Sequence, residues 1–444
     1  MEKLYSRIKK VFSGEEIRKY FFNTSWMMGE KVIAIILSMI TSIFVARYLG
    51  PEDFGILSYA VSLSSLFAIS THMGLSGLAV REMVNKPDET EELMGSIFGI
   101  KFIGAFIALF SYLVFISLTG DRSSTEYWVL ILISITIFLK PFEVFDYWFQ
   151  AKVKAKYSSI VRSVSSIIVS ILKITLVIIS AGLLEFASTY IVQTILVISL
   201  FTYFFIKKAD SSIKKWKFEF QRVKELLSEG WMVMLGAIFA IVYLKIDQVM
   251  IRWLISAEEV GVYSVAARIS ESWYFIPTII VSSLFPKLIE LKRESQEKFR
   301  NRLQQLFNLL FLIALSLAVV ISFIAKPLIV GLYGAEYQYA SLILQIHIWA
   351  GVFIFMRAIF SKWVLVEDAL AFSLITQGFG ALANVLTNIL LIPAYGGVGA
   401  AIATIFSYAM ASYIALLFYK KSRPIFWMMT KAIFFPFQIL KKIK

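Results

Sequence analysis

The sequence predicts an all-α integral membrane protein whose twelve transmembrane helices form two similar lobes of six. Three observations support this fold class. Hydrophobic residues make up 59% of the 444-residue chain and charged residues only 17%, with a mean hydropathy of +0.75. A soluble chain of this length would need far more polar surface. Apolar runs of membrane-spanning length recur along the chain, and a charged turn between two such runs occurs twice.

The first half begins with a segment suited to the membrane surface and continues with six apolar runs. Residues 1 to about 22 alternate apolar and basic groups, a pattern typical of a surface-lying helix. Crossing about 30 Å of hydrocarbon takes about 20 helical residues. Runs of that length predict spans at about 26–48, 54–76, 95–118, 127–149, 158–180 and 186–206. Pro141 in the fourth span predicts a kink there.

The second half repeats this arrangement after a basic linker over residues 207–228. Spans are predicted at about 229–254, 260–284, 303–325, 339–362, 370–392 and 397–419. Pro277 and Pro286 predict kinks in the eighth span. The tail 424–444 is aromatic and basic, and its apolar run is interrupted by Lys431 and Pro436, which predicts an interfacial segment. The expected domains are an N-terminal lobe (1–206), the linker (207–228), a C-terminal lobe (229–423) and the tail (424–444).

Basic residues are distributed very unevenly between the two sides of the predicted spans. The segments on the side of the N-terminus hold 32 lysines and arginines, and the opposite loops hold only Arg122 and Lys326. The positive-inside rule then places both termini in the cytoplasm, with the chain in the cytoplasmic (inner) membrane. The net charge of +14 therefore indicates a collar facing anionic lipid and not a nucleic-acid surface.

Ten basic residues fall within the predicted spans. Five lie near span ends, where long side chains can reach the interface: Arg47, Lys101, Arg162, Arg252 and Arg357. Five lie deeper, and facing lipid each would cost on the order of 3 kcal/mol: Lys31, Lys140, Lys173, Lys245 and Arg268. We expect these five to face protein or a water-filled cavity.

Acidic residues in the same spans are candidate charge partners or coupling groups. They are Glu30, Glu143, Asp146, Asp247 and Glu271. Glu143 lies three residues after Lys140, and Glu271 three after Arg268, so each pair is expected to form along its own helix. Two interpretations remain open. The charges form a structural ion-pair network, or they line a net-cationic cavity between the halves that receives an anionic head group.

No signature of an enzyme or a metal site is present. The chain has no cysteine and two histidines, and it lacks phosphate-binding, zinc-protease and nucleophile-elbow motifs. The predicted outer loops are too short for a catalytic domain, and no cofactor is expected. His347 is expected in the core. Asn384 and Asn388 share a helix face and are expected to make interhelical hydrogen bonds or sugar contacts.

The repeated turn is the strongest internal feature. The stretch from Arg47 reads RYLGPEDFGILSYA, and the stretch from Arg252 reads RWLISAEEVGVYSVA. Gly55, Ser58 and Ala60 match Gly261, Ser264 and Ala266 at a constant offset of 206 residues. A duplicated helical unit with a substrate path between its halves is typical of transporters.

The first copy, from Arg47 to Gly55, resembles the signature of bacterial and archaeal polysaccharide-biosynthesis flippases. These O-antigen-type transporters of lipid-linked oligosaccharides share a superfamily with the MATE multidrug exporters and the lipid II flippases. Further segments similar to that family lie at 146–151, 246–251, 261–270, 332–337 and 395–403. The resemblance therefore spans nearly the whole chain.

The resemblance implies a MATE-like fold with two lobes related by a pseudo-two-fold axis along the membrane normal. It also implies alternating access of a central cavity that moves a polyprenyl-pyrophosphate-linked oligosaccharide to the outer leaflet. The cationic role carries over to Arg268, and less directly to Lys31, Lys173 and Lys245. Implied partners are the lipid-linked glycan, membrane lipid, a glycan polymerase and other export proteins, without nucleic acid.

Three other functions make different predictions from the sequence. A MATE-type cation-coupled exporter predicts an acid-dominated cavity, whereas bases outnumber acids in the middle of these spans. A glycan-processing enzyme predicts a catalytic outer loop, and a membrane scaffold predicts no charge at mid-membrane. The flippase is the interpretation that fits these features best.

Overall fold

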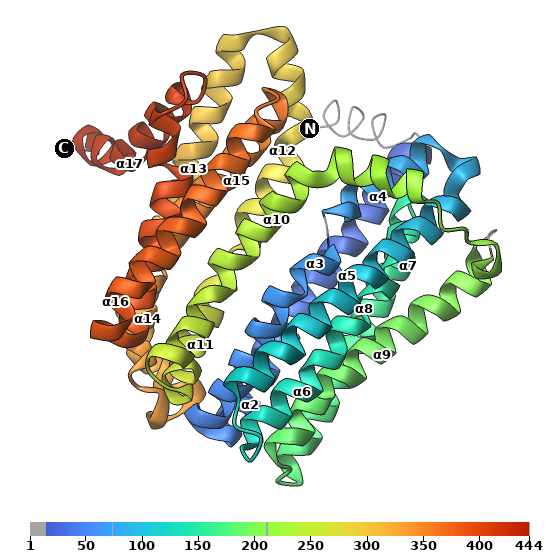
Figure 1. The fold of residues 1–444 in the computed structure, drawn as a ribbon. Coiled ribbons are helices and arrows are strands. Elements are labelled where there is room, and N and C mark those ends of the chain that lie inside the picture. The colour runs from blue at the N-terminus through green and yellow to red at the C-terminus, as the bar shows by residue number, and fades with distance from the viewer. Residues whose placement is uncertain (1–14, 73, 210–211, 444) are drawn as a thin grey trace. The chain divides into compact units, whose positions relative to one another are not determined.

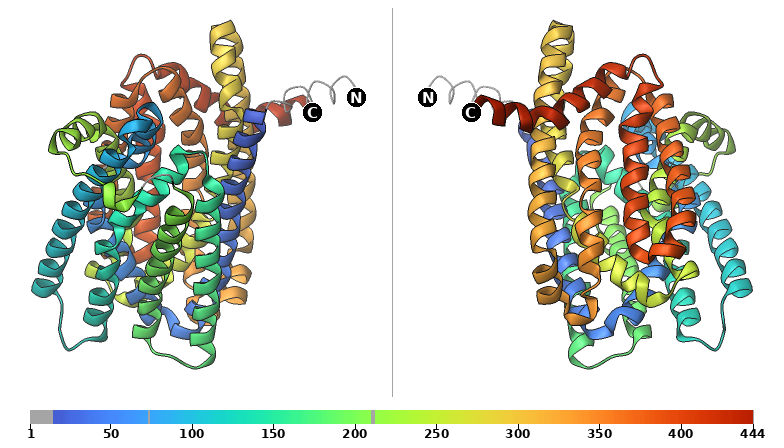
Figure 2. Two further views of the ribbon diagram at one scale, coloured as in Figure 1. Left: turned by 90° about the vertical axis from the view of Figure 1, so that its right-hand side faces the viewer. Right: turned by 90° about the vertical axis from the view of Figure 1, so that its left-hand side faces the viewer.

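The computed structural model describes residues 15–72, 74–209 and 212–443. Throughout this part of the chain the regular elements are helices, and no strand occurs (Figures 1 and 2). The chain packs as two compact units: unit 1 is Met1–Ser42 with Phe67–Met234, and unit 2 is Ile43–Leu66 with Leu235–Lys444. Most of the surface helix expected over residues 1–22 lies outside the described residues.

Unit 1 contains the beginning of α2 (Glu15–Phe67), a bundle of shorter helices and the beginning of α10. Its helices are α3 (Ile69–His72), α4 (Leu75–Asn85), α5 (Thr90–Thr119), α6 (Thr125–Phe138), α7 (Val144–Ala151), α8 (Ala155–Ile178) and α9 (Leu183–Lys208), with short turns η1 (Pro87–Glu89), η2 (Lys140–Glu143) and η3 (Ile213–Lys215). Trp148, Phe145 and Phe205 lie in its buried core, where α7 and α9 pack together.

Unit 2 contains the rest of α2 and most of α10 (Phe220–Leu254). Its other helices are α11 (Ala257–Glu271), α12 (Phe275–Glu294), α13 (Gln296–Tyr333), α14 (Ala340–His347), α15 (Ala350–Val366), α16 (Leu370–Ser412) and α17 (Arg423–Ile443), with turns η4 (Ala335–Tyr337) and η5 (Ile414–Leu417). Its core lies where α12, α13, α15 and α17 pack against one another.

The described residues include nine helical stretches long and apolar enough to cross a membrane, or ten if the bent pair of α6 with η2–α7 is one span. Two helices are broken at a glycine: α2 at Gly50 (φ 75°, ψ 174°) and α16 at Gly396 (φ 54°, ψ −134°). Only glycine adopts such positive φ values without strain. The predicted all-helical, multi-span fold is confirmed, with nine or ten spans counted.

The proline predictions are partly correct. The fourth predicted span bends by 42° between α6 and η2–α7, where Pro141 lies. The eighth predicted span is interrupted at residues 272–274, before Pro277, and α12 continues as a helix through Pro286. Likewise α17 continues as a helix through Pro436, so this proline interrupts the apolar run of the tail without ending the helix.

Part of the predicted basic linker is helical, because α10 begins at Phe220, inside the segment 207–228. The chain just before α10 packs tightly on α5. A Cβ added to Gly95 would lie 2.4 Å from the carbonyl oxygen of Lys217. The backbone N–H of Glu219 donates to the Ser96 hydroxyl at 3.0 Å. The linker and the start of α10 are therefore part of unit 1.

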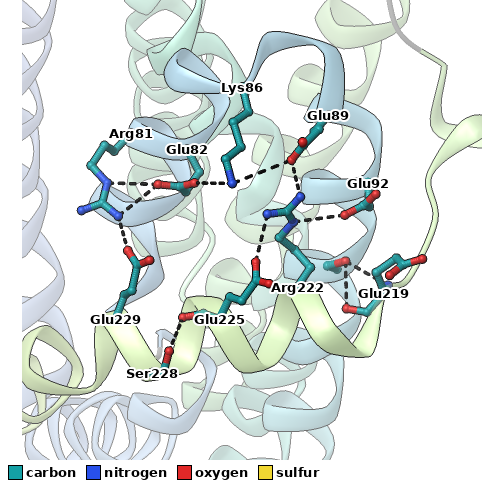
Figure 3. Close-up of polar contacts among 11 residues, drawn as sticks. Arg81, Glu82, Lys86, Glu89, Glu92, Glu219, Arg222, Glu225, Ser228 and Glu229 are labelled. Atoms are coloured by element: carbon teal, nitrogen blue, oxygen red, sulfur yellow. Dashed lines mark hydrogen bonds and ion pairs between the residues drawn. The ribbon is translucent and has the colours of Figure 1, made fainter.

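Ion pairs hold the first turns of α10 to the loop between α4 and α5 (Figure 3). The guanidinium of Arg222 donates to the carboxylates of Glu89, Glu92 and Glu225, with the Glu92 bond at 3.1 Å. Arg81 of α4 donates in the same way to Glu229. A network of several charges is more stabilising than an isolated surface pair.

In unit 2 the two copies of the repeated turn touch each other through their glycines. A Cβ added to Gly55 would lie 1.8 Å from the carbonyl oxygen of Ala257. A Cβ added to Gly261 would lie 1.9 Å from the carbonyl oxygen of Pro51. Each contact becomes the other when 206 is added to or subtracted from its residue numbers. The packing is thus reciprocal, as expected of two related copies of one turn that face each other.

Candidate functional site

The first polar cluster of unit 1 is centred on Glu143, at the bend between α6 and α7. Its carboxylate accepts from the ammonium groups of Lys101 on α5 and Lys140 on η2, both at 3.1 Å. The pair predicted between Lys140 and Glu143 is therefore confirmed. Lys101 is fully buried and also donates to the Tyr147 hydroxyl at 3.0 Å. The expectation that Lys101 reaches the interface is wrong. Its carboxylate partner, Glu143, lies 42 residues later in the sequence, so local spacing does not indicate the pair.

The second cluster of unit 1 is centred on Asp146, which is only 3% exposed on α7. It accepts from the Arg162 guanidinium of α8 at 2.6 Å and from the Gln150 amide at 2.9 Å. Glu30 on α2 is half-buried and lies within electrostatic reach of Arg162, Asp146 and Lys31. Two acids and two bases therefore meet at this place.

The two remaining predicted bases of unit 1 are not held by a carboxylate in the described residues. Lys173 on α8 is half-buried, and its ammonium lies 4.3 Å from the ring centroid of Tyr190 on α9. A desolvated cation over an aromatic ring gains about 2 kcal/mol or more. Lys31 on α2 is exposed. Unit 1 therefore carries more positive than negative charge within its apolar helices.

Unit 2 holds a different cluster, centred on the carboxylate of Asp247, which is 4% exposed on α10. It accepts from the Tyr263 hydroxyl of α11 at 2.7 Å. From α16 it accepts from the Thr404 hydroxyl at 2.7 Å and the Asn388 amide at 2.6 Å. Asn388 also donates to Asn384 at 3.2 Å within α16, so the predicted interhelical hydrogen bond is the one from Asn388 to Asp247 of α10.

The donors to Asp247 are neutral, in contrast to the arginine on Asp146. Within the described part of unit 2, Asp247 forms no ion pair. His347, 2% exposed, stacks edge-on against Tyr263 at 5.8 Å, as expected of a core histidine. An ionisable group held in this way inside apolar helices is a candidate functional site. The sequence identified Asp247 and the asparagines but missed Tyr263 and Thr404, which come from other helices.

Arg268 does not pair with Glu271 as the helical spacing predicts. The Arg268 guanidinium lies 5.5 Å from the ring centroid of Phe54, and no ion pair with Glu271 forms in the described residues. Glu271 is partly buried and lies within electrostatic reach of Lys245. The prediction of an Arg268–Glu271 pair is wrong, because an aromatic ring from α2 holds the arginine.

This arrangement can bind charged ligands. Among the described residues no three histidine, cysteine or acidic side chains lie close enough to hold a metal ion. Within unit 1 Lys140 pairs with Glu143, and Glu30 lies within electrostatic reach of Asp146. Within unit 2 Glu271 lies within electrostatic reach of Lys245. Cations in excess of carboxylates within apolar helices suit an anionic ligand.

Comparison with known proteins identifies relatives over most of the chain. "Probable flippase AglR" of Haloferax volcanii is 24% identical over 404 residues, covering 87% of this chain and 81% of the relative. "Putative O-antigen transporter" of Shigella flexneri is 25% identical over 330 residues, covering 71% of this chain and 77% of the relative.

Solved structures share the fold. The lipid II flippase MurJ in an inward closed conformation aligns with a TM-score of 0.72 at 15% identity, covering 95% of this chain and 93% of that one. An inward-facing MATE multidrug transporter aligns with a TM-score of 0.68 at 14% identity, covering 90% and 96%. The sequence profile described as polysaccharide biosynthesis protein matches residues 21–292, more than half of the chain. The chain therefore belongs to the polysaccharide biosynthesis protein family.

Proposed function

We propose that this protein is a flippase that moves a polyprenyl-pyrophosphate-linked oligosaccharide across the cytoplasmic membrane by alternating access. The family, the flippase and O-antigen transporter names of its relatives, and the MurJ-like fold support this proposal. The lipid-linked glycan is the substrate, the membrane lipid surrounds the protein, and a glycan polymerase and other export proteins act on the product.

The observation that carries the proposal is the excess of base over acid within the apolar helices. In unit 1 one carboxylate, Glu143, serves both Lys101 and Lys140. Lys173 lies against an aromatic ring, as does Arg268 in unit 2. A pyrophosphate would supply the missing negative charge, since cations within apolar helices are expensive unless they are compensated. Lys31, Lys140, Lys173, Lys245 and Arg268 are the proposed substrate contacts.

The proposed topology is twelve spans in two six-helix lobes with both termini in the cytoplasm. Counting the bent pair α6/α7 as one span gives ten. Counting α2 and α16 as two spans each, because of their breaks at Gly50 and Gly396, gives twelve. The proposed lobes are residues 1–206 and 229–423, with a cytoplasmic linker between them and an interfacial tail. The distribution of basic residues sets the orientation.

Asp247 is the proposed coupling group, which exchanges a cation or proton during transport. Its carboxylate is buried among hydroxyl and amide groups from three helices, so a change in its charge would alter contacts in all of them. The proposal predicts that Asp247→Asn abolishes transport while the protein remains in the membrane. Normal transport by Asp247→Asn would contradict a coupling role for Asp247. That result would not bear on the proposed substrate contacts.

A MATE-type cation-coupled exporter of small molecules is the second candidate. The similarity to MATE structures and the buried carboxylate at Asp247 favour it. Such an exporter differs from the proposed flippase in its substrate, which would be cationic. Replacing bases such as Lys173 should then leave export unchanged or improve it, whereas a flippase for an anionic lipid should lose activity.

The test measures glycan at the surface of a flippase-deficient host, alongside the amount of protein in the membrane. Lys173→Gln combined with Arg268→Gln should lose most transport at normal abundance, and Lys173→Arg should retain it. Lys362→Gln is the matched control, because Lys362 also lies over an aromatic ring, 5.1 Å from the centroid of Phe285, but near the end of α15. Full transport by the double variant would overturn the proposed contacts of Lys173 and Arg268 with the anionic substrate.

A further inference from the structure

A cavity of about 410 Å³ lies in unit 2, at the end of the unit where α13 begins. Its walls come from the first turns of α13, the last turn of α15 and the segment that leads into α17. The side chains that decide its chemistry are Phe299, Arg300, Trp363, Glu367, Lys420 and Lys421. None of them belongs to the polar clusters described above. The volume is within the range of small-ligand sites, which begins at about 300 Å³.

The cavity is strongly basic. Arg300, Lys420 and Lys421 are exposed, and none has a hydrogen bond or ion pair to another described residue. The one acid in the wall, Glu367, is already neutralised by an ion pair with Lys292 of α12. Three bases from two segments of the chain therefore face one cavity without a counter-charge. Guanidinium and ammonium groups in this arrangement suit phosphate oxygens.

The rest of the wall is mostly apolar. Phe299 is 1% and Trp363 6% exposed, and Leu303, Pro424, Ile425 and Met428 also line it, with Gln296 as the one uncharged polar side chain. A free phosphate would use only the basic rim. A ligand that carries a phosphate on an apolar body would use both parts of the cavity.

The helix that closes the cavity, α17, has the character of an interfacial helix. It packs on α13 at this end of unit 2 (Figure 1), with Met429 fully buried. On its other side Trp427 and Phe434 are 58% and 56% exposed, and Lys431 is exposed as well. Aromatic and basic residues together on one helix face are typical of the lipid head-group layer. The mouth of the cavity therefore lies at the depth of lipid phosphates.

We propose that this cavity binds the glycerophosphate head group of an anionic membrane phospholipid. Arg300, Lys420 and Lys421 contact the phosphate, and Phe299 and Trp363 pack against the glycerol and the first carbons of the acyl chains. Basic pockets between membrane helices commonly hold such head groups. The proposal depends on the membrane placement of α13, α15 and α17, and not on the identity of the transported substrate.

The test is lipid binding to the purified full-length protein, measured by native mass spectrometry during titration with phosphatidylglycerol. Phosphatidylcholine is the zwitterionic comparison, and inorganic phosphate and pyrophosphate are the soluble competitors. Retention of phosphatidylglycerol over phosphatidylcholine is expected, with little displacement by either soluble anion. The combined Arg300→Gln, Lys420→Gln, Lys421→Gln variant should bind phosphatidylglycerol about tenfold more weakly or worse.

The control variant removes the same charge outside the cavity, through Arg293→Gln, Arg302→Gln and Lys431→Gln. It should keep the affinity, because none of these residues lines the cavity. Glu367→Gln should strengthen binding, a gain that misfolding cannot produce. Equal losses in the two triple variants, equal retention of both lipids, or displacement of the lipid by pyrophosphate would each overturn the proposal.

Discussion

The glycine contact between the two repeated turns gives the sharpest prediction about how unit 2 works. In Gly55→Ala the new Cβ would lie 1.8 Å from the carbonyl oxygen of Ala257, whereas Cβ contacts below 3.0 Å are essentially never seen. The two backbones must therefore part by at least about 1.2 Å. Overpacking of this kind costs about 1–3 kcal/mol. Neither partner atom is a flexible side chain, so the strain cannot be relieved by a change of rotamer.

In a transporter with alternating access, that cost falls only on the state in which the two turns touch. The population ratio of the touching state to a separated state should then fall by about 5- to 150-fold. Gly261→Ala, at 1.9 Å from the carbonyl oxygen of Pro51, should have an effect of the same size. The double variant should cost less than the sum, because one separation of the backbones relieves both contacts.

The assay is the distance between nitroxide labels at Glu52→Cys and Glu258→Cys, which are exposed positions related by the same offset of 206. The chain has no native cysteine, so the labels are unique. A longer distance should become populated in both alanine variants, and glycan export should slow. Gly331→Ala is the control, because nothing lies within 4 Å of its added Cβ on α13. An unchanged distance distribution in Gly55→Ala at normal abundance would refute the reasoning.

Three further predictions concern stability and topology. Glu143→Gln leaves the buried Lys101 without a carboxylate and should lower the amount of folded protein, with a cost of about 3–5 kcal/mol, and adding Lys101→Met should restore much of it. Arg222→Gln removes three charged hydrogen bonds and should destabilise the linker end of α10 by about 2 kcal/mol, seen as faster proteolysis of the preceding segment. Cysteine at Ser123 should react with an impermeant reagent in whole cells, and cysteine at Ser212 only after permeabilisation.

Each of these predictions has its own control. Lys224→Gln removes an exposed charge from the same helix as Arg222 and should leave proteolysis unchanged. A double Lys101→Met, Glu143→Gln variant no more abundant than Glu143→Gln alone would contradict the buried-pair argument. Labelling of cysteine at position 212 in intact cells would reverse the proposed orientation.

The multi-span helical fold was predictable because the length of each apolar run can be read directly from the sequence. The predicted apolar runs lie mainly in helices, but two adjacent pairs join into the broken helices α2 and α16, and the runs at 127–149, 260–284 and 339–362 are each divided between two helices. The joins depend on Gly50 and Gly396, whose positive φ values redirect the chain without a loop. The packing of the first turns of α10 was not predictable in the same way, because Glu89 and Glu92, the partners of Arg222, lie about 130 residues earlier in the sequence.

Local spacing predicted the candidate site only where the partners lie on one helix turn and nothing else competes. Lys140 and Glu143 pair as their spacing indicates. Arg268 and Glu271 have the same spacing, yet the guanidinium lies over Phe54, more than 200 residues away in sequence. An i, i+3 pair gains only about 0.2–0.5 kcal/mol, which is less than a desolvated cation gains from an aromatic ring. Tertiary contacts therefore decide the outcome.

The repeated turn shows why a weak internal match can still be informative. The positions shared by its two copies are small and buried: Ser58 and Ser264 are 7% and 3% exposed, and Ala60 and Ala266 are both fully buried. The glycines at 55 and 261 allow backbone to touch backbone. Small residues let membrane helices approach closely, and a larger side chain would separate them. Neighbouring positions differ between the copies although they are buried as well, as Phe54 against Val260 and Tyr59 against Val265 show, so it is the small size of the shared residues that accompanies the close contact.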